Sequence, residues 1–189
     1  MLTLRGAPAL SPFRLEKLSL AVRSAVPRIL RIHTGYWHFA ETSRQPSPAE
    51  EQVLSRILRY GPALPPDQPA GELMLVLPRP GTISPWSSKA TDIAIHCGLD
   101  CVTRLERGIG YYFEAQGAPL VAAERAALMP LIHDRMTESV FGALEDAARL
   151  FRHVEPASLA RVDILGGGRD ALERANREMG LALSPDEVD

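Results

Sequence analysis

The sequence predicts an α+β fold of two related halves, followed by a helical segment. Ser-Pro dipeptides recur at the start of amphipathic segments, where serine caps a helix and proline suits its first turn. Short apolar runs that suit strands alternate with these helices. A shift of 73 residues also places ALSPF (9–13) on TISPW (82–86) and LTL (2–4) on LVL (75–77). We therefore predict that a pseudo-twofold axis relates two α+β halves.

Composition excludes several function classes. With 46% hydrophobic residues, the 189-residue chain can bury a core, and its net charge of −2 offers no polycation to a nucleic acid. No apolar run reaches the ~18 residues of a membrane helix, and the N-terminus lacks the pattern of a signal peptide. The two cysteines build no disulfide framework. We expect a cytoplasmic protein that binds neither membrane nor nucleic acid.

The first predicted half covers about residues 1–61. Residues 1–4 suit a short strand, and Ser11-Pro12 opens a helix. The aromatic-rich run 29–42 is long for one strand, so we expect Gly35 to mark a bend. Ser47-Pro48 opens the next helix, and Glu50 completes a capping box with Ser47. The proline-rich residues 62–70 are interpreted as a stiff linker.

The second predicted half covers about residues 71–135 and follows the same order. Residues 73–77 suit a strand, and Ser84-Pro85 opens a helix. In the run 101–115 apolar and polar positions alternate, and Gly108 and Gly110 are predicted bends or hairpin points. A helix over 121–133 should be kinked by Pro130 and turn Leu128, Leu131 and Ile132 inward.

The remaining residues predict a helical continuation. Apolar spacing favours a helix over 136–152, which completes a domain of residues 1–152. Residues 153–165 are irregular, Gly166–Gly168 is a flexible break, and a helix follows. Ser184-Pro185 and Glu187 then form a capping box two residues before the sequence stops. We interpret 153–189 as the start of a truncated linker domain, and the chain as a fragment.

No residue pattern predicts an active site. His96, Cys97 and Cys101 lack the second ligand pair of a zinc site, and both cysteines fall on predicted apolar faces. There is no nucleophile elbow and no Walker sequence for phosphate, and the other histidines suit polar strand or helix-end positions. We therefore expect no catalytic, cofactor-binding or metal-binding residue, which favours an interaction module over a complete enzyme.

The stretch PRPGTISPWSSKATDIA (78–94) carries more hydroxyl groups than helix capping requires. This surplus makes it a candidate interface with another domain, formed by Ser84, Trp86, Ser87, Ser88 and Lys89. A structural role is the alternative: Ser84 caps the helix, Trp86 joins the core, and Lys89 is solvated.

Four segments also carry a resemblance to a known family. PRPGTISPWSSKATDIA, CGLDCVTRLERGIGYY (97–112), HDRMTESVF (133–141) and residues 162–189 resemble, in this order, the N-terminal region of phosphoribosylformylglycinamidine synthases. These formylglycinamide ribonucleotide amidotransferases, here in their large single-chain form, act in de novo purine biosynthesis. They convert formylglycinamide ribonucleotide, glutamine and ATP into formylglycinamidine ribonucleotide, glutamate, ADP and phosphate.

The resemblance implies how such a chain is organised. A synthetase domain with ATP and magnesium, and a glutaminase domain, would follow in the same chain and be partners of this region. The N-terminal domain resembles a dimer of the small subunit of split enzymes, and a helical linker follows it. We therefore expect a region that holds no cofactor, is inactive alone, and organises both domains for ammonia transfer.

Two other functions stay open at this stage. The chain could be a stand-alone module that binds separately encoded synthetase and glutaminase subunits, or a sensor of a small ligand or nucleotide. In isolation we also expect self-association through surfaces that the missing domains would cover.

Overall fold

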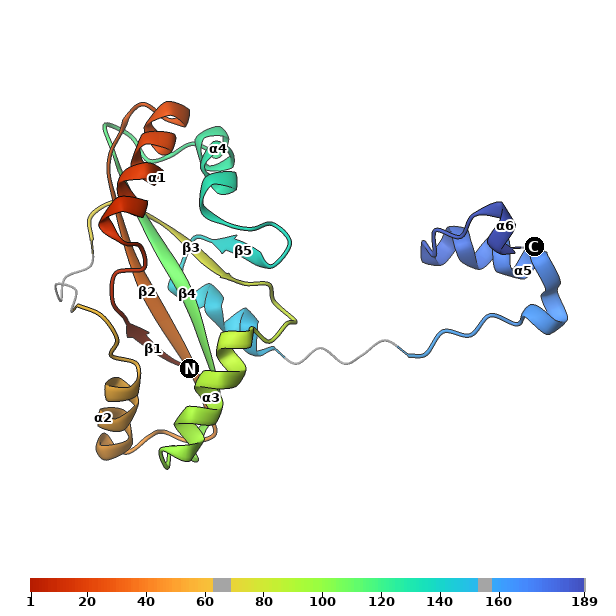
Figure 1. Ribbon diagram of the computed structural model, residues 1–189, viewed down its shortest axis with the longest axis horizontal. Helices are drawn as coiled ribbons and strands as arrows, with labels where there is room; N and C mark the ends of the chain where they lie inside the picture. The colour runs from red at the N-terminus through yellow and green to blue at the C-terminus, as the bar shows by residue number, and fades with distance from the viewer. Residues whose placement is uncertain (63–68, 153–157, 189) are drawn as a thin grey trace. The chain divides into compact units, whose positions relative to one another are not determined.

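The computed structural model describes residues 1–62, 69–152 and 158–188, and the chain forms two compact units, Met1–His153 and Val154–Asp189. The first unit is an α+β fold on one five-stranded antiparallel sheet of order β1-β2-β4-β3-β5 (Figure 1). Its elements are β1 (Leu2–Arg5), α1 (Pro12–Ala25), β2 (Ile29–Thr42), α2 (Pro48–Ile57), β3 (Glu72–Pro78), α3 (Pro85–His96), β4 (Val102–Ala115), α4 (Ala122–Ile132), β5 (Glu138–Phe141) and the 3₁₀ helix η1 (Leu144–Phe151). Residues 63–68 of the predicted linker, and His153, lie outside the described residues.

The two long strands are unbroken, so the predicted bends at Gly35, Gly108 and Gly110 are wrong. Each strand has 14 residues, and Gly35 pairs with Gly110 in the middle of β2 and β4. Two of the glycines are needed for close packing instead. A Cβ on Gly110 would lie 2.8 Å from Nε1 of Trp37, and one on Gly108 would lie 2.7 Å from the Val76 carbonyl oxygen.

The pairing of β2 with β4 agrees with the 73-residue shift found in the sequence. Tyr36 lies opposite Ile109, which is 73 residues further along the chain. At the edge strands the shift fails. Leu4 of β1 pairs with His38 of β2, so the same shift would pair Leu77 of β3 with Tyr111 of β4. In the structure Met74, not Leu77, lies opposite Tyr111. The central pairing therefore follows the 73-residue shift while β3 is displaced by three residues, and the duplication stays a prediction.

Four helices pack on one face of the sheet as two pairs. Helices α1 and α4 cover one end of the β2–β4 pair, and α2 and α3 the other (Figure 1). Between the two helix pairs, the side chains on this face come from the strands. The buried residues of the two clusters include Val22, Ile32, Phe113 and Leu128 at the first end, and Leu54, Ala94, Leu99 and Leu105 at the second. Leu131, predicted to point inward, is 37% exposed, whereas Leu128 and Ile132 are buried.

The helix predicted over residues 136–152 is wrong, because β5 and η1 occupy this segment. Strand β5 pairs with the outer edge of β3, which would otherwise leave backbone groups unpaired. Its Val140 and Phe141 are good strand formers. The apolar spacing that suggested a helix belongs to η1, which buries Ala147 and Leu150 against Trp37 on the other face of the sheet.

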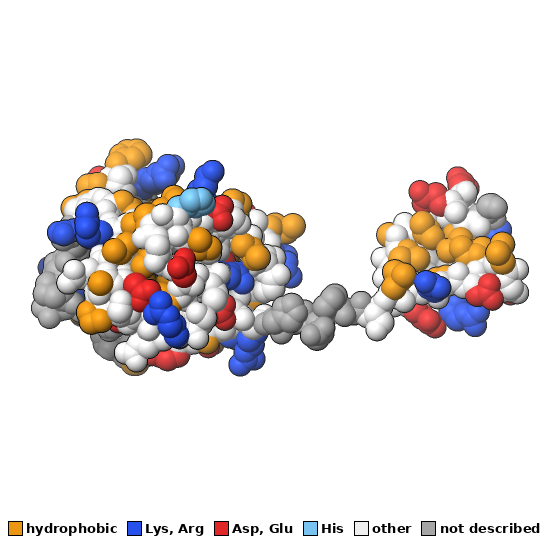
Figure 2. Space-filling model, turned by 90° about the horizontal axis from the view of Figure 1, so that it is seen from below, with side chains coloured by type: hydrophobic (Ala, Val, Ile, Leu, Met, Phe, Trp, Pro, Cys, Tyr) orange, Lys and Arg blue, Asp and Glu red, His pale blue; other side chains and the backbone are white. Residues whose placement is uncertain are grey.

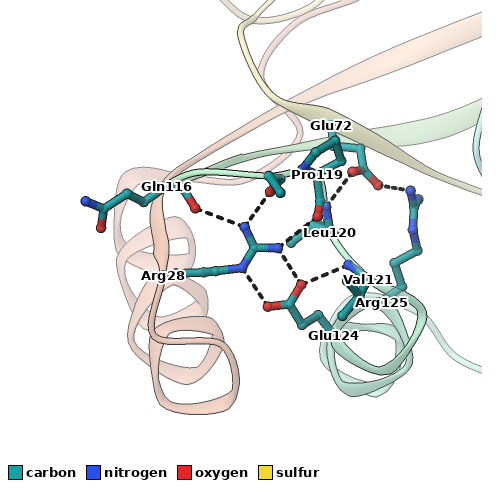
Figure 3. Close-up of polar contacts among 9 residues, drawn as sticks. Arg28, Glu72, Gln116, Pro119, Leu120, Val121, Glu124 and Arg125 are labelled. Atoms are coloured by element: carbon teal, nitrogen blue, oxygen red, sulfur yellow. Dashed lines mark hydrogen bonds and ion pairs between the residues drawn. The ribbon is translucent and has the colours of Figure 1, made fainter.

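At the end of the sheet covered by α1 and α4, a charged clamp joins the turn after α1 to α4 and the loop before it (Figure 3). Arg28, in the turn between α1 and β2, donates to both carboxylate oxygens of Glu124 at 2.6 and 2.5 Å. The same guanidinium donates to the carbonyl groups of Gln116, Ala118 and Pro119 in the β4–α4 loop. Arg28 therefore ties segments about ninety residues apart.

The second unit contains α5 (Ile164–Met179) and α6 (Pro185–Val188). The predicted break at Gly166–Gly168 is instead a kink inside α5, where Gly168 has a φ of 54°. Asp163 caps the first turn by accepting a hydrogen bond from the Gly166 N–H at 2.9 Å, and this offsets the weak helix propensity of the glycines. None of the described helices is both long and apolar enough to cross a membrane.

Candidate interdomain interface

The candidate surface begins at the N-terminus of α3, where Ser84 is used by the fold. Its hydroxyl oxygen accepts a hydrogen bond from the Ser87 N–H at 3.0 Å, which caps the helix. The same hydroxyl donates to Oε2 of Glu106 at 3.0 Å. Ser84 is therefore engaged on both sides, as the structural alternative expected.

Behind Ser84, a buried ion pair anchors the loop that leads into α3. Glu106 is fully buried, and Arg104 donates to its Oε1 through Nε at 3.2 Å. Arg104 also donates to the carbonyl groups of Thr82 at 2.8 Å and Leu150 at 2.9 Å. This network joins the loop, β4 and η1, so the start of α3 is held rigidly.

The five predicted residues do not form one surface. Ser87 is buried, and its hydroxyl has no hydrogen-bond partner among the described residues. Trp86 is half-buried and packs toward the sheet, whereas Ser88 and Lys89 are exposed. Of the set, only Ser88 and Lys89 point freely outward.

An apolar groove lies next to the start of α3, between the β3–α3 loop and the segment before β5. It has a volume of about 490 Å³ and includes Thr82, Ser84 and Pro85 in its lining. Ile83 and Met136, which also line it, are 64% and 73% exposed. Exposed side chains of this size at a groove are typical of a contact surface.

On the sheet side of α3, Trp86 belongs to a group of aromatic rings around Arg107. The Arg107 guanidinium carbon lies 4.4 Å from the ring centre of Tyr36, 4.9 Å from that of Trp86 and 5.9 Å from that of Tyr60. All four side chains are half-buried. They come from β2, α3, β4 and the segment after α2, and lie on the face of the sheet that carries the helices.

His38 lies beneath this group and is fully buried. Its Nε2 is 2.5 Å from the Tyr60 hydroxyl, which also accepts a hydrogen bond from Arg107 at 3.2 Å. Burial, and secondly the charge of Arg107, lower the pKa of His38 to about 4, although the Leu4 backbone opposes the shift. Burial likewise raises the pKa of Tyr60, so both rings are neutral at pH 7.

Sequence reasoning missed this group. It assigned His38 to a polar strand position, which is wrong because the side chain is in the core. It did not single out Arg107 at all. A signal was present, since Arg107 lies between Leu105 and Ile109 on the apolar face of an alternating strand, where a charged residue is unusual.

The two cysteines are both free thiols in different surroundings. Cys97, predicted to be on the apolar face of its helix, is exposed at the end of α3, so that prediction is wrong. Cys101 is buried, and burial raises its pKa, which disfavours the reactive thiolate. Within residues 1–62, 69–152 and 158–188, no three His, Cys, Asp or Glu side chains are placed to hold a metal ion.

A known protein family matches the part of the chain that carries this surface. A family model described as formylglycinamide ribonucleotide amidotransferase N-terminal matches residues 35–151, more than half of the chain. The matched range runs from β2 to η1 and contains α3, the groove and Arg107.

Proposed function

The chain belongs to the formylglycinamide ribonucleotide amidotransferase N-terminal family, and we propose that it organises the synthetase and glutaminase domains of that enzyme for ammonia transfer. The family makes the chain part of an enzyme of purine biosynthesis. In this proposal ATP and magnesium bind to the synthetase domain, and the chain itself takes no part in the chemistry. The family match carries the proposal.

Exposed apolar surface supports a docking role. In the first unit, the exposed Ile83 and Met136 line the groove next to the start of α3. In the second unit hydrophobic side chains form a band across one face (Figure 2), and Ile164, Leu165, Met179 and Leu181 are all exposed. Surfaces of this kind usually contact another protein surface. Two free thiols suit a reducing compartment, and we propose the cytoplasm.

The proposal is tested in the intact enzyme by separating two activities. The variant Ile83→Asp combined with Lys89→Glu should lower glutamine-dependent product formation by about tenfold. Activity supported by added ammonium should be retained, because the synthetase chemistry does not depend on docking of the glutaminase. Glutamate released per product formed should rise as ammonia escapes. Lys17→Glu on α1, the other lysine of the chain, is the matched charge control.

Equal loss of both activities would contradict a role in ammonia transfer. Unchanged coupling in the double variant would show that the surface at the start of α3 is not the docking site. If the natural subunits prove to be separately encoded, the same surface would bind them in trans, and the assay would be run on the reconstituted complex.

A further inference from the structure

We propose that Arg107 is the anchor point of the interface and binds a carboxylate group of the synthetase or glutaminase part of the enzyme. The inference rests on the proposed function and adds the chemistry of the contact. Arg107 and the rings of Tyr36, Tyr60 and Trp86 around it form the Arg107 site.

Within the part of the chain that the structure describes, the hydrogen-bonding capacity of Arg107 is largely unused. A guanidinium has five N–H donors, yet Arg107 makes one hydrogen bond to a described residue, to the Tyr60 hydroxyl. None of the described carboxylates forms an ion pair with it. By contrast, Arg28, Arg44, Arg104 and Arg125 each pair with a glutamate. A half-buried charge without an ion-pair partner among the described residues favours a partner of opposite charge.

The rings around Arg107 hold its guanidinium ready for such a partner. Tyr36 and Trp86 lie 4.4 and 4.9 Å from its central carbon, which restricts the side chain before binding. A guanidinium that lies over aromatic rings can still donate two parallel hydrogen bonds from its edge to a carboxylate. Because little side-chain entropy remains to be lost, one carboxylate can bind with good affinity.

The surroundings also set the charge of the ligand. His38 and Tyr60, the titratable groups that hydrogen bonds link to Arg107, add no charge near neutral pH, so the site presents a single positive charge. An aspartate or glutamate of the partner balances one charge. Arginine, tyrosine and tryptophan are also the residues most enriched at energetic hot spots of interfaces.

The Arg107 site lies at one end of the sheet, and the 73-residue shift gives no second copy of it among the described residues. The 73-residue shift brings Thr34 to the place of Arg107, Tyr111 to that of His38 and Phe13 to that of Trp86. Thr34 and Tyr111 are buried and uncharged. The two ends of the sheet therefore differ in chemistry, and the anchor gives the fold a single orientation toward its partner.

The affinity test uses this chain and the remaining part of the enzyme as separate polypeptides. Titration calorimetry should show binding by the parent chain, and Arg107→Met should weaken it by about 10- to 100-fold. Arg107→Lys keeps the charge but loses the planar fork, so its loss should be intermediate. The control is Arg59→Met, at the exposed arginine directly before Tyr60 in the sequence, and it should leave the affinity unchanged. Circular dichroism and the melting temperature report whether each variant is folded.

A second measurement identifies the carboxylate directly. In the complex of Arg107→Lys, a carbodiimide should couple the new amine to an aspartate or glutamate of the partner, and mass spectrometry locates the cross-link. The native Lys17, on α1, gives the background for an exposed amine outside the interface. If Arg107→Met fails to fold, this cross-link alone tests whether position 107 contacts a carboxylate of the partner.

The possible failures are distinguishable. Lack of binding by the parent chain would overturn the proposed function and the anchor together. Equal affinities of the parent and the folded Arg107→Met chain would overturn the anchor alone. An Arg107→Lys complex in which the new amine couples to no partner carboxylate would do the same.

Discussion

His38 and Arg107 occupy opposing positions of the β2–β4 pair, and the guanidinium helps to keep the imidazole uncharged. The two side chains share the Tyr60 hydroxyl, which accepts from Arg107 and lies 2.5 Å from Nε2 of His38. A neutral His38 can accept the hydroxyl hydrogen of Tyr60, so the three groups form one chain of hydrogen bonds. Protonation of His38 would remove the acceptor at Nε2 and place two positive charges beside the Tyr60 hydroxyl.

The buried histidine should therefore make the fold sensitive to mild acid. The pKa of His38 is about 4 in the fold and about 6.5 in an unfolded chain, so between these values only the unfolded state binds the proton. The free energy of unfolding should be constant above pH 6.5 and fall by up to about 3 kcal/mol as the pH drops toward 4. Urea titrations at several pH values measure it.

The variant His38→Gln should flatten this dependence between pH 6.5 and 4.5, where carboxylates are still ionised in both states. His96→Gln, at an exposed position on α3, should leave it unchanged. A parent chain whose stability does not change over this range would contradict the assignment of a neutral, buried His38.

Removing the charge of Arg104 should lower the free energy of unfolding more than removing the charge of its partner Glu106. Arg104→Met keeps the aliphatic stem but leaves the charge of Glu106 buried without its partner, and should cost about 3 to 5 kcal/mol. Glu106→Gln removes the buried charge, can still accept from Ser84, and leaves Arg104 its two carbonyl contacts. Its loss should be clearly smaller in urea unfolding. A larger loss of stability in Glu106→Gln than in Arg104→Met would show that Arg104 is not needed to compensate the buried charge of Glu106.

The central glycines give a third prediction. Gly110→Ala would bring a methyl group to 2.8 Å from Nε1 of Trp37, which is itself held by a hydrogen bond to Tyr112. Such overpacking should lower the free energy of unfolding by about 1 to 3 kcal/mol. Gly142→Ala is the matched control, because no atom lies within 4 Å of the added carbon and its effect should stay within about 0.5 kcal/mol. Equal thermal stability of the two variants would show that Gly110 is not required for packing.

Local signals in the sequence predicted much of the fold. Helices α1, α2 and α3 begin at Pro12, Pro48 and Pro85 as the Ser-Pro caps predicted, because capping depends only on neighbouring residues. Apolar or aromatic-rich runs predicted β1, β2 and β3, alternation predicted β4, and β5 was not predicted. That strand is set by the free edge of β3, about sixty residues earlier in the chain, and no local pattern describes a free edge.

The Arg107 site could not be predicted for a related reason. Its members come from four segments, and their contacts depend on the register that places His38 opposite Arg107. A one-residue change of register would turn one of the two side chains to the other face. The stretch around Ser84 was found from its hydroxyl groups, yet two of these, Ser84 and Ser87, are enclosed by the fold.

The clamp between Arg28 and Glu124 supports a last prediction about acid stability. Glu124 has a pKa of about 2, chiefly because it accepts hydrogen bonds from Arg28 and also from the Val121 N–H. In an unfolded chain its pKa is near 4.5, so the clamp stabilises the fold fully above pH 4.5 and this contribution is lost as the pH falls toward 2.

The variant Arg28→Met tests this contribution. It should lower the urea midpoint at pH 7 and reduce the further loss of stability between pH 4.5 and 2. Arg44→Met removes a comparable pair with Glu50, but Arg44 is more exposed and only six residues away, so its effect at pH 7 should be smaller. A parent midpoint no higher than that of Arg28→Met at pH 7 would show that the distant pairing of α1 and α4 does not depend on this clamp.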